Sequence, residues 1–366
     1  WLGKILCNVQ GQDNLERDVH KSEWVALALM AFGVVALAVA LPWVSSTIVT
    51  PYVKRLVGGS MLAPSLSALT IVAVCAFIIL APVLGCLLAG ADRIITARMQ
   101  GRRGPVLLQP YYDVRKLLEK DTSRLDPVMT CLVVLALLAA IVAGAVFFCG
   151  GNFLLCVFLI TLSSLFFILA CYLSPSPMAQ TGAQREILQV MSYEPMVLFV
   201  GVALYLTTSA TQGKGSFDVS SLFAGDATLA VCMPLIFLGL LFVLTIKLRK
   251  SPFDLSMAHH AHQELVRGAT TEMSGRVLAI VEVTHWYENV LFLGWVGMFF
   301  INANPLSILL AIVVVAIVWF IEILIDNNFA RVKWQVMLKG AWGVALVASI
   351  VNFSLFYYLS SGVIIF

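Results

Sequence analysis

The sequence predicts an all-α integral membrane protein. Of its 366 residues, 60% are hydrophobic and only 12% are charged, whereas soluble domains contain roughly 45–50% apolar and 25% charged residues. The mean hydropathy is +0.95. The apolar segments are continuous rather than alternating, which favours membrane-spanning helices over a β-barrel.

Nine segments reach the roughly 20 apolar residues that a helix needs to cross a bilayer. The first is 24–49, and the eight that follow are 62–90, 128–149, 152–174, 187–209, 228–247, 277–301, 305–325 and 341–362. We therefore expect an eight-helix transmembrane bundle in residues 61–366, preceded by one leading transmembrane helix in residues 1–60.

Basic residues predict how the bundle is oriented. Loops 91–127, 175–186, 248–276 and 326–340, with the residues beside them, hold 17 of the 23 lysines and arginines. The loops of the opposite face hold Lys214. Because short cytoplasmic loops carry the excess of basic residues, we expect these four loops to share the cytoplasmic face.

The leading segment fits this orientation less well, because it would place Lys54 and Arg55 on the outer face. Met61 looks like an initiator methionine. The polar stretch WLGKILCNVQGQDNLERDVHKSEW before an apolar helix resembles the end of antiporter-like subunits of complex I relatives. Residues 1–60 are therefore either the tail of such a subunit or an ordinary anchoring helix.

The eight cysteines show no CxxC pair, and seven lie in or beside apolar spans. Cysteine in such a setting usually behaves as a small hydrophobic residue. We expect this chain to ligate no iron–sulfur cluster and to hold no disulfide framework.

Four motifs carry a family resemblance. They read RMQGRRGPVLLQPYYDVRKLLEKD, QREILQVMSYEPMVLF, SPFDL with QELVRGATTEMSG, and IEILIDNNFARVK. In this order they resemble the membrane subunit that holds the quinone chamber of respiratory complex I. The same signatures occur in membrane subunits of energy-converting [NiFe] hydrogenases and formate hydrogenlyases. The resemblance covers residues 61–366 and implies the eight-helix fold of that subunit.

Two departures indicate the hydrogenase branch. The segment PFDLSMAHHAHQELVRG is three residues longer than the usual complex I form and has histidines where acids would stand, and RRGPVLLQP lacks an insertion. Both resemble the energy-converting (Ech-type) hydrogenases. This implies an ion-translocating coupling subunit, in which ferredoxin-dependent proton reduction drives H⁺ or Na⁺ pumping across the inner membrane of a prokaryote.

The resemblance also implies the cofactors and partners. The [NiFe] centre and the iron–sulfur clusters are expected in other subunits, with none in this chain. The expected partners are the hydrogenase large and small subunits, a ferredoxin-like iron–sulfur subunit and an antiporter-like membrane subunit, within the lipid bilayer and without nucleic acid. Two alternatives are a quinone-binding subunit of a complex I-type NADH dehydrogenase and a stand-alone secondary transporter. The second is weakened because no inverted repeat is visible.

Intramembrane acids are the candidate proton or ion pathway, because a charge at bilayer depth costs about 2.5–3.5 kcal/mol on insertion scales. Glu194 precedes Pro195 within an apolar span, where an ion pair with Arg185 is the structural alternative. His285 is three residues from both Glu282 and Glu288, so it can relay a proton between them or belong to a packing strip.

The remaining candidates are near the predicted cytoplasmic face. The resemblance implies that Glu264 and Glu272 lie at the entrance of the route. Glu322 and Asp326 are expected near the end of the seventh helix, where Arg331 or Lys333 could pair with them. Glu186 is expected in an interfacial pair beside Arg185. We assign no catalytic residue and no metal site, although HHxH has suitable ligands. The predicted docking and coupling residues are Arg98, Arg102, Arg103, Asp113, Arg115, Lys116, Asp254 (alternatively a helix cap), His259, His260 and His262.

Overall fold

The computed structural model describes residues 68–120, 127–225, 227–256 and 268–360. Within these ranges the chain is almost entirely helical, as the sequence predicted, and eight helices have fourteen residues or more. They are α4 (Ala68–Met99), α6 (Pro127–Phe148), α7 (Phe153–Tyr172), α8 (Pro177–Gln212), α10 (Pro234–Lys247), α11 (Gly275–Met298), α12 (Leu306–Asn328) and α13 (Trp334–Ser360). Residues 1–60, Glu264 and the three loop histidines lie outside the described residues.

Six helices are long and apolar enough to cross a membrane, namely α4, α6, α7, α8, α12 and α13. The chain is therefore a membrane protein with several apolar helices. Helix α10 is shorter, with 14 residues, and the four-residue helix α9 (Leu229–Cys232) precedes it. Helix α11 has 24 residues but is interrupted by polar side chains.

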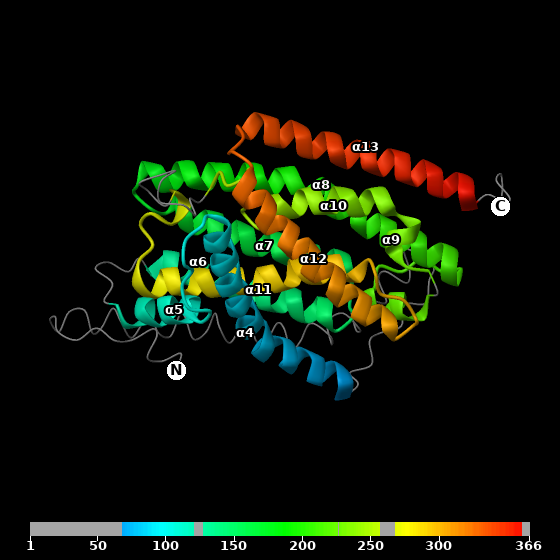
Figure 1. Cartoon of the computed structure of the whole chain (residues 1–366), viewed down its shortest axis with the longest axis horizontal. Coiled ribbons are helices and arrows are strands. Elements are labelled where there is room, and N and C mark those ends of the chain that lie inside the picture. Colours follow the sequence, from blue (N-terminus) through cyan, green and yellow to red (C-terminus); the bar gives the residue numbers. More distant parts are fainter. Residues whose placement is uncertain (1–67, 121–126, 226, 257–267, 361–366) are drawn as a thin grey trace.

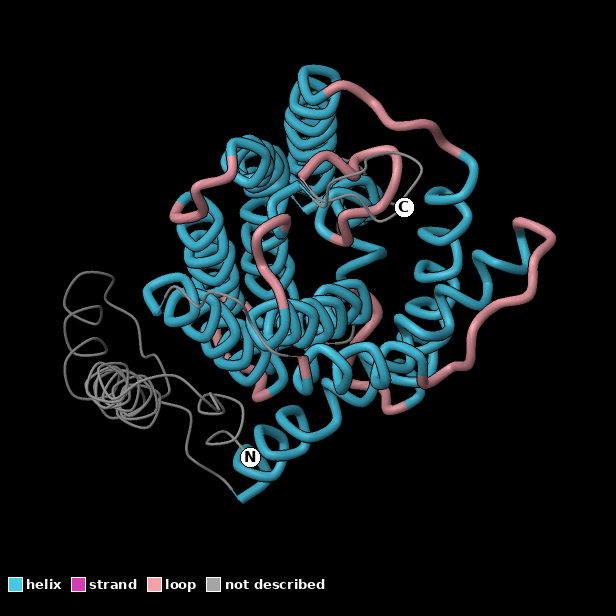
Figure 2. Tube along the Cα trace, turned by 90° about the vertical axis from the view of Figure 1, so that its left-hand side faces the viewer, coloured by secondary structure: helices cyan, strands magenta, loops and turns pink. Residues whose placement is uncertain are grey.

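The basic loops gather at one end of the bundle, as predicted. Helix α5 (Gln109–Glu119) and the first turns of α8 and α11 lie at the left of Figure 1, and Figure 2 views the molecule from this side. Ion pairs join the loops to one another: Lys250 lies 2.8 Å from Asp92, and Arg331 lies 3.3 Å from Asp254. The described parts of loops 91–127, 248–276 and 326–340 therefore meet at one face, which we call the basic end.

Helix α8 begins ten residues before the span that the sequence predicted. Pro177 occupies its first turn, Pro195 lies within it, and Gly213, at φ 72°, ends it. At about 1.5 Å per residue, 36 residues measure roughly 54 Å, which exceeds the hydrocarbon core of a bilayer. Arg185 and Glu186, which we expected in a loop, are therefore helical residues.

The polar helix α11 occupies a central position, where it contacts α4, α5, α6, α10 and α12. Its last eight residues, from Leu291 on, are apolar, and Leu291, Phe292 and Trp295 are among the most buried side chains. Glu282, His285 and Glu288 lie before them, nearer the basic end. The helices around α11 thus bury the carboxylate of Glu288, whereas Glu282 is half-buried.

Candidate functional site

The end of α10 has an unusual backbone. The N–H of Arg249 donates to the carbonyl of Ile246 at 3.1 Å, and that of Lys250 donates to Thr245 at 3.1 Å. This is the Schellman pattern, which normally places glycine in the left-handed position. Here Arg249 occupies it, at φ 53°. A left-handed residue with a side chain costs about 1–2 kcal/mol, so surrounding contacts must hold Arg249 in place.

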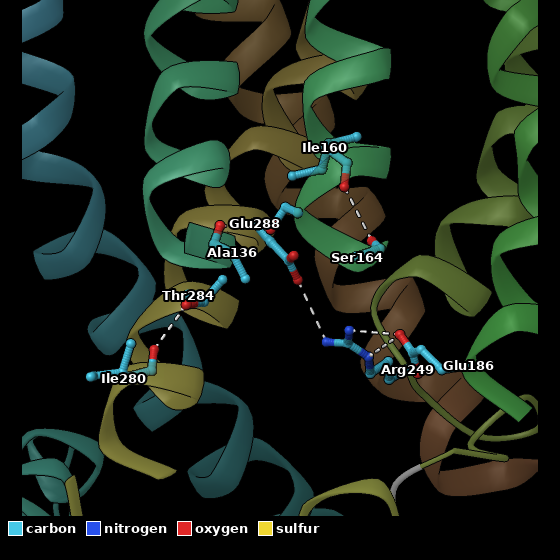
Figure 3. Close-up of polar contacts among 9 residues, drawn as sticks. Ala136, Ile160, Ser164, Glu186, Arg249, Ile280, Thr284 and Glu288 are labelled. Carbon is cyan, nitrogen blue, oxygen red and sulfur yellow. Dashed lines mark hydrogen bonds and ion pairs between the residues drawn. The ribbon is translucent and has the colours of Figure 1, made fainter. Parts of the chain in front are cut away.

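Those contacts are two buried carboxylates from different helices. The Nε and Nη2 atoms of Arg249 donate to Oε1 of Glu186 at 3.2 and 2.8 Å, and Nη1 donates to Oε2 of Glu288 at 3.5 Å. The three side chains are 11%, 6% and 7% exposed. Figure 3 shows the guanidinium between the two carboxylates. We call Glu186, Arg249 and Glu288 the arginine triad.

A small cavity adjoins the triad. It offers about 10 Å³ of space, room for roughly one water molecule. Arg249, Thr284, His285 and Glu288 line its polar side. The His285 ring also meets the Phe167 ring edge-on, with the centroids 6.2 Å apart. The predicted neighbours His285 and Glu288 thus share a polar cavity with Arg249, while Glu282 is half-buried on the same helix.

Lys247, the last residue of α10, is held differently. Its Nζ lies 3.6 Å from the ring centroid of Tyr193, 4.8 Å from that of Phe292 and 5.8 Å from that of Trp295. These distances are in the range of cation–π contacts. Glu194, Glu186 and Glu288 are near enough for their charges to act on Lys247. The predicted Glu194 therefore belongs to the surroundings of this lysine.

Lys250 forms a second charged group, between α4 and α12. Its Nζ donates to Oδ2 of Asp92 at 2.8 Å, and its charge also acts on Glu322. Glu322 is only 2% exposed, and its Oε2 has no hydrogen-bond partner among the described residues. Oδ1 of Asp326 accepts a hydrogen bond from the backbone of Ser251 at 2.8 Å. Glu322 and Asp326 are thus near each other, as predicted, but in a different cluster from Glu288.

The PFDL turn is anchored by its backbone carbonyls. Gln189 donates to the carbonyl of Phe253 at 2.6 Å, and Arg185 donates to that of Leu255 at 3.1 Å. Asp254 is buried and pairs with Arg331. No helix starts at residues 255–256, so the cap expected as an alternative for Asp254 is not formed there. The turn is instead held between α8 and the loop before α13.

The first basic loop folds back on α4. The N–H of Arg102 donates to the carbonyl of Ala97 at 2.9 Å and that of Gly101, at φ 70°, donates to Arg98 at 3.1 Å. This second Schellman turn places Arg98, Arg102 and Arg103 around an open hollow of about 490 Å³. All three arginines are exposed, as the predicted docking role requires.

Helix α5 carries the other predicted docking residues. Asp113 pairs with Arg93 at 2.5 Å, and Arg115 forms an exposed pair with Glu119 at 3.0 Å, while Lys116 is exposed. Partial burial raises the pKa of Asp113, but hydrogen bonds from Arg93 and Gln109 outweigh it and hold this pKa below its usual value. Glu272 is also exposed, just before α11.

Sequence reasoning missed the cations that organise the site. Lys247, Arg249 and Lys250 were counted only as loop charges, and Glu186 was expected in an interfacial pair. In the structure Glu186 is buried and its partner is Arg249. A usable signal was present: KLRK begins at the last residue of an apolar helix, and only Ser251 separates it from the PFDL turn. Among the described residues no group of three potential ligands could hold a metal ion.

Comparisons with known proteins show which membrane subunits this chain resembles. The chain is 30% identical to Hydrogenase-4 component C of Escherichia coli (strain K12), over 72% of this chain and 89% of the relative. It is 28% identical to Formate hydrogenlyase subunit 4 of the same organism, over 77% and 94%. It is also 28% identical to the H component of NADH-quinone oxidoreductase from Paramagnetospirillum magneticum, over 73% and 83%. Each relative is named as one component of a larger assembly, which implies partner subunits here.

A solved structure agrees at the level of the fold. A chain of the membrane-bound sulfane sulfur reductase, an archaeal respiratory membrane complex, superposes with a TM-score of 0.67. It is 21% identical, and the match covers 77% of this chain and 99% of that chain. The family model described as NADH dehydrogenase matches residues 69–357. With most of its length matched in this way, the chain belongs to the NADH dehydrogenase family.

Proposed function

We propose that this chain is the ion-translocating membrane coupling subunit of an energy-converting [NiFe] hydrogenase in the inner membrane of a prokaryote. It links ferredoxin-dependent proton reduction to the pumping of H⁺ or Na⁺. It holds no redox cofactor, and the [NiFe] centre and iron–sulfur clusters belong to partner subunits. Hydrogenase-4 component C and Formate hydrogenlyase subunit 4 support the hydrogenase branch, as do the histidines of the segment after PFDL.

The arginine triad is the observation that carries this proposal. Burying three ionised side chains among apolar helices is costly, and an apolar set of similar volume often gives equal or greater stability. A membrane anchor therefore has no need of it. Ionisable groups within the bilayer that face a cavity or one another are typical of proton and ion routes. The triad also adjoins a cavity with room for a water molecule.

The geometry suggests how a redox event could act on this route. Arg249 lies two residues after the end of α10. The PFDL turn begins three residues later and is tied to α8 and to Arg331. A displacement of this turn by a docked partner would move Arg249 relative to Glu186 and Glu288. Since a nearby cation favours the charged form of a carboxyl group, such a movement shifts the protonation equilibria of Glu186 and Glu288. Loops 91–127 and 248–276 are the proposed docking surface for the hydrogenase and ferredoxin-like subunits.

The test uses the whole complex in sealed inverted vesicles, supplied with reduced ferredoxin. Hydrogen evolution and acidification of the lumen are recorded together, with a protonophore or a sodium ionophore added to identify the ion. We expect Glu186→Gln, Glu288→Gln, Glu194→Gln and Glu282→Gln to reduce pumping at least tenfold. Hydrogen evolution from an artificial donor in detergent should persist, because the electron path lies in other subunits.

Lys214→Gln, at an exposed lysine outside the docking loops, is the control and should pump normally. Full gradients in all four glutamate variants would show that these acids are structural. Quinone reduction by the complex, with no hydrogen formed, would instead support the complex I-type alternative, which the similarity to the NADH-quinone oxidoreductase component favours.

A further inference from the structure

Lys247 differs from the two basic residues that follow it. Arg249 is tied to Glu186 and Lys250 is tied to Asp92 by ion pairs. Lys247 is equally buried, at 7% exposure, but no described carboxylate forms an ion pair with it. Its ammonium instead faces three aromatic rings, from Tyr193 on α8 and from Phe292 and Trp295 on α11.

These surroundings allow the ammonium group of Lys247 to release a proton. An aromatic face attracts an ammonium group, but it cannot accept the proton. The guanidinium of Arg249 does not release a proton in proteins, whereas an ammonium on a flexible four-carbon stem can. Of Lys247 and Arg249, only Lys247 can therefore alternate between a charged and a neutral form.

The protonation of Lys247 is linked to that of the carboxyl groups around it. The charges of Glu288, Glu194 and Glu186 act on Lys247, and so does the charge of Arg249. Groups that interact in this way take up and release protons as a unit.

We propose that Lys247 is a proton carrier between the arginine triad and Glu194. A proton leaves the carboxylic acid of Glu288 for the neutral Nζ of Lys247, which gives a carboxylate and an ammonium. The ammonium then releases that proton to the carboxylate of Glu194, which restores the amine and forms a carboxylic acid. Total charge is unchanged in each step. A bridging water or a swing of the lysine side chain closes each gap.

The position of Lys247 fits this order. Glu186 lies nine residues into α8 and Glu194 lies eight residues further from the basic end. The charge of this deeper Glu194 acts on Lys247, and Arg249 pairs with the shallower Glu186. This inference rests on the proposed function, since a proton carrier needs a proton to be moved.

The decisive comparison is Lys247→Arg against Lys247→Met in the assembled complex, with proton uptake into sealed vesicles measured per hydrogen evolved. Arginine keeps the positive charge but not the release of a proton. We expect both variants to lower proton uptake at least tenfold while electron transfer in detergent continues. Lys214→Met, at an exposed lysine, should pump normally. Normal uptake by Lys247→Arg or Lys247→Met overturns the inference.

A second pair keeps the lysine in place and guards against assembly failure. Tyr193→Leu removes the nearest aromatic face and Tyr193→Phe retains it. Losing the aromatic face destabilises the charged form of Lys247, so the pH profile of pumping should move to lower pH in Tyr193→Leu. In Tyr193→Phe, which keeps the ring, the profile should stay in place. An unshifted profile in Tyr193→Leu contradicts a titrating Lys247. If a sodium ionophore alone abolishes the gradient of the wild-type complex, the pumped ion is Na⁺, so Lys247 is not a proton carrier although the proposed ion translocation stands. If the wild-type complex builds no gradient at all, both proposals are wrong.

Discussion

Nη2 of Arg249 lies 2.8 Å from Oε1 of Glu186, and this contact joins the segment after α10 to α8 inside the bundle. The same guanidinium reaches Glu288 on α11. Three helices are therefore held by one side chain, and its removal should affect stability and transport separately.

Arg249→Met should destabilise the subunit by about 3–5 kcal/mol, because two buried carboxylates lose their cation. The triple variant Glu186→Gln, Arg249→Met and Glu288→Gln removes every charge and should recover most of this loss. Thermal unfolding of the solubilised complex measures both. Ion pumping should remain absent in the triple variant. If the triple variant is no more stable than Arg249→Met, uncompensated charge is not the cause of the loss.

Lys250→Gln should loosen α4 from α10, because it leaves Asp92 and the nearby Glu322 without their cation. We expect a loss of about 2–4 kcal/mol, measured as earlier thermal unfolding, while Lys250→Arg should lose much less. Equal losses in the two variants would mean that the stem of the lysine, rather than its charge, makes the important contact.

The link between α4 and α5 should weaken in acid. Asp113 has a folded-state pKa below its usual value of 3.8, so its stabilising contribution is complete above that pH and disappears as the pH falls through the lowered pKa. Amide hydrogen exchange of residues 109–119 should accelerate over this range. In Asp113→Asn the exchange should be fast already at neutral pH, and a wild-type profile in that variant would show that the pair with Arg93 does not hold α5.

Gly85 lets α4 approach α11 closely. A Cβ at this position would lie 2.6 Å from Cβ of Trp286, a distance that forces the helices apart. Gly85→Val should therefore cost about 1–3 kcal/mol in thermal unfolding. Gly343→Val is the matched control, because Gly343 is an exposed helical glycine on α13 with no atom within 4 Å of the added Cβ. Similar losses at the two sites would indicate a helix-propensity effect alone.

The helices could be predicted from the sequence because continuous apolar runs permit few other structures in a membrane. The shared face of the loops followed from the arginine and lysine distribution. The start of α8 could not be placed in this way, because QTGAQRE is polar and yet helical. A search for apolar spans therefore finds the apolar part of such a helix and omits the polar turns at its start.

The candidate site was predicted only in part. The acids Glu194 and Glu288 stood out because they interrupt apolar segments, and the structure brings both near Lys247. Their cations did not stand out, because KLRK also satisfies the rule for cytoplasmic charge. The left-handed conformation of Arg249 has no sequence signature, since glycine is the residue usually expected there. That conformation directs Lys247, Arg249 and Lys250 to different partners.

The polarity of α11 also bears on how the chain enters a membrane during synthesis. Glu282, His285 and Glu288 make this helix a poor candidate for insertion on its own. Helix α10 precedes it along the chain and brings Arg249, the cation that Glu288 contacts. Synthesis therefore delivers the counter-charge before the acid, so that α11 can leave the insertion machinery together with a neighbour already in place. The order of the two helices in the gene is thus part of what makes a buried carboxylate tolerable.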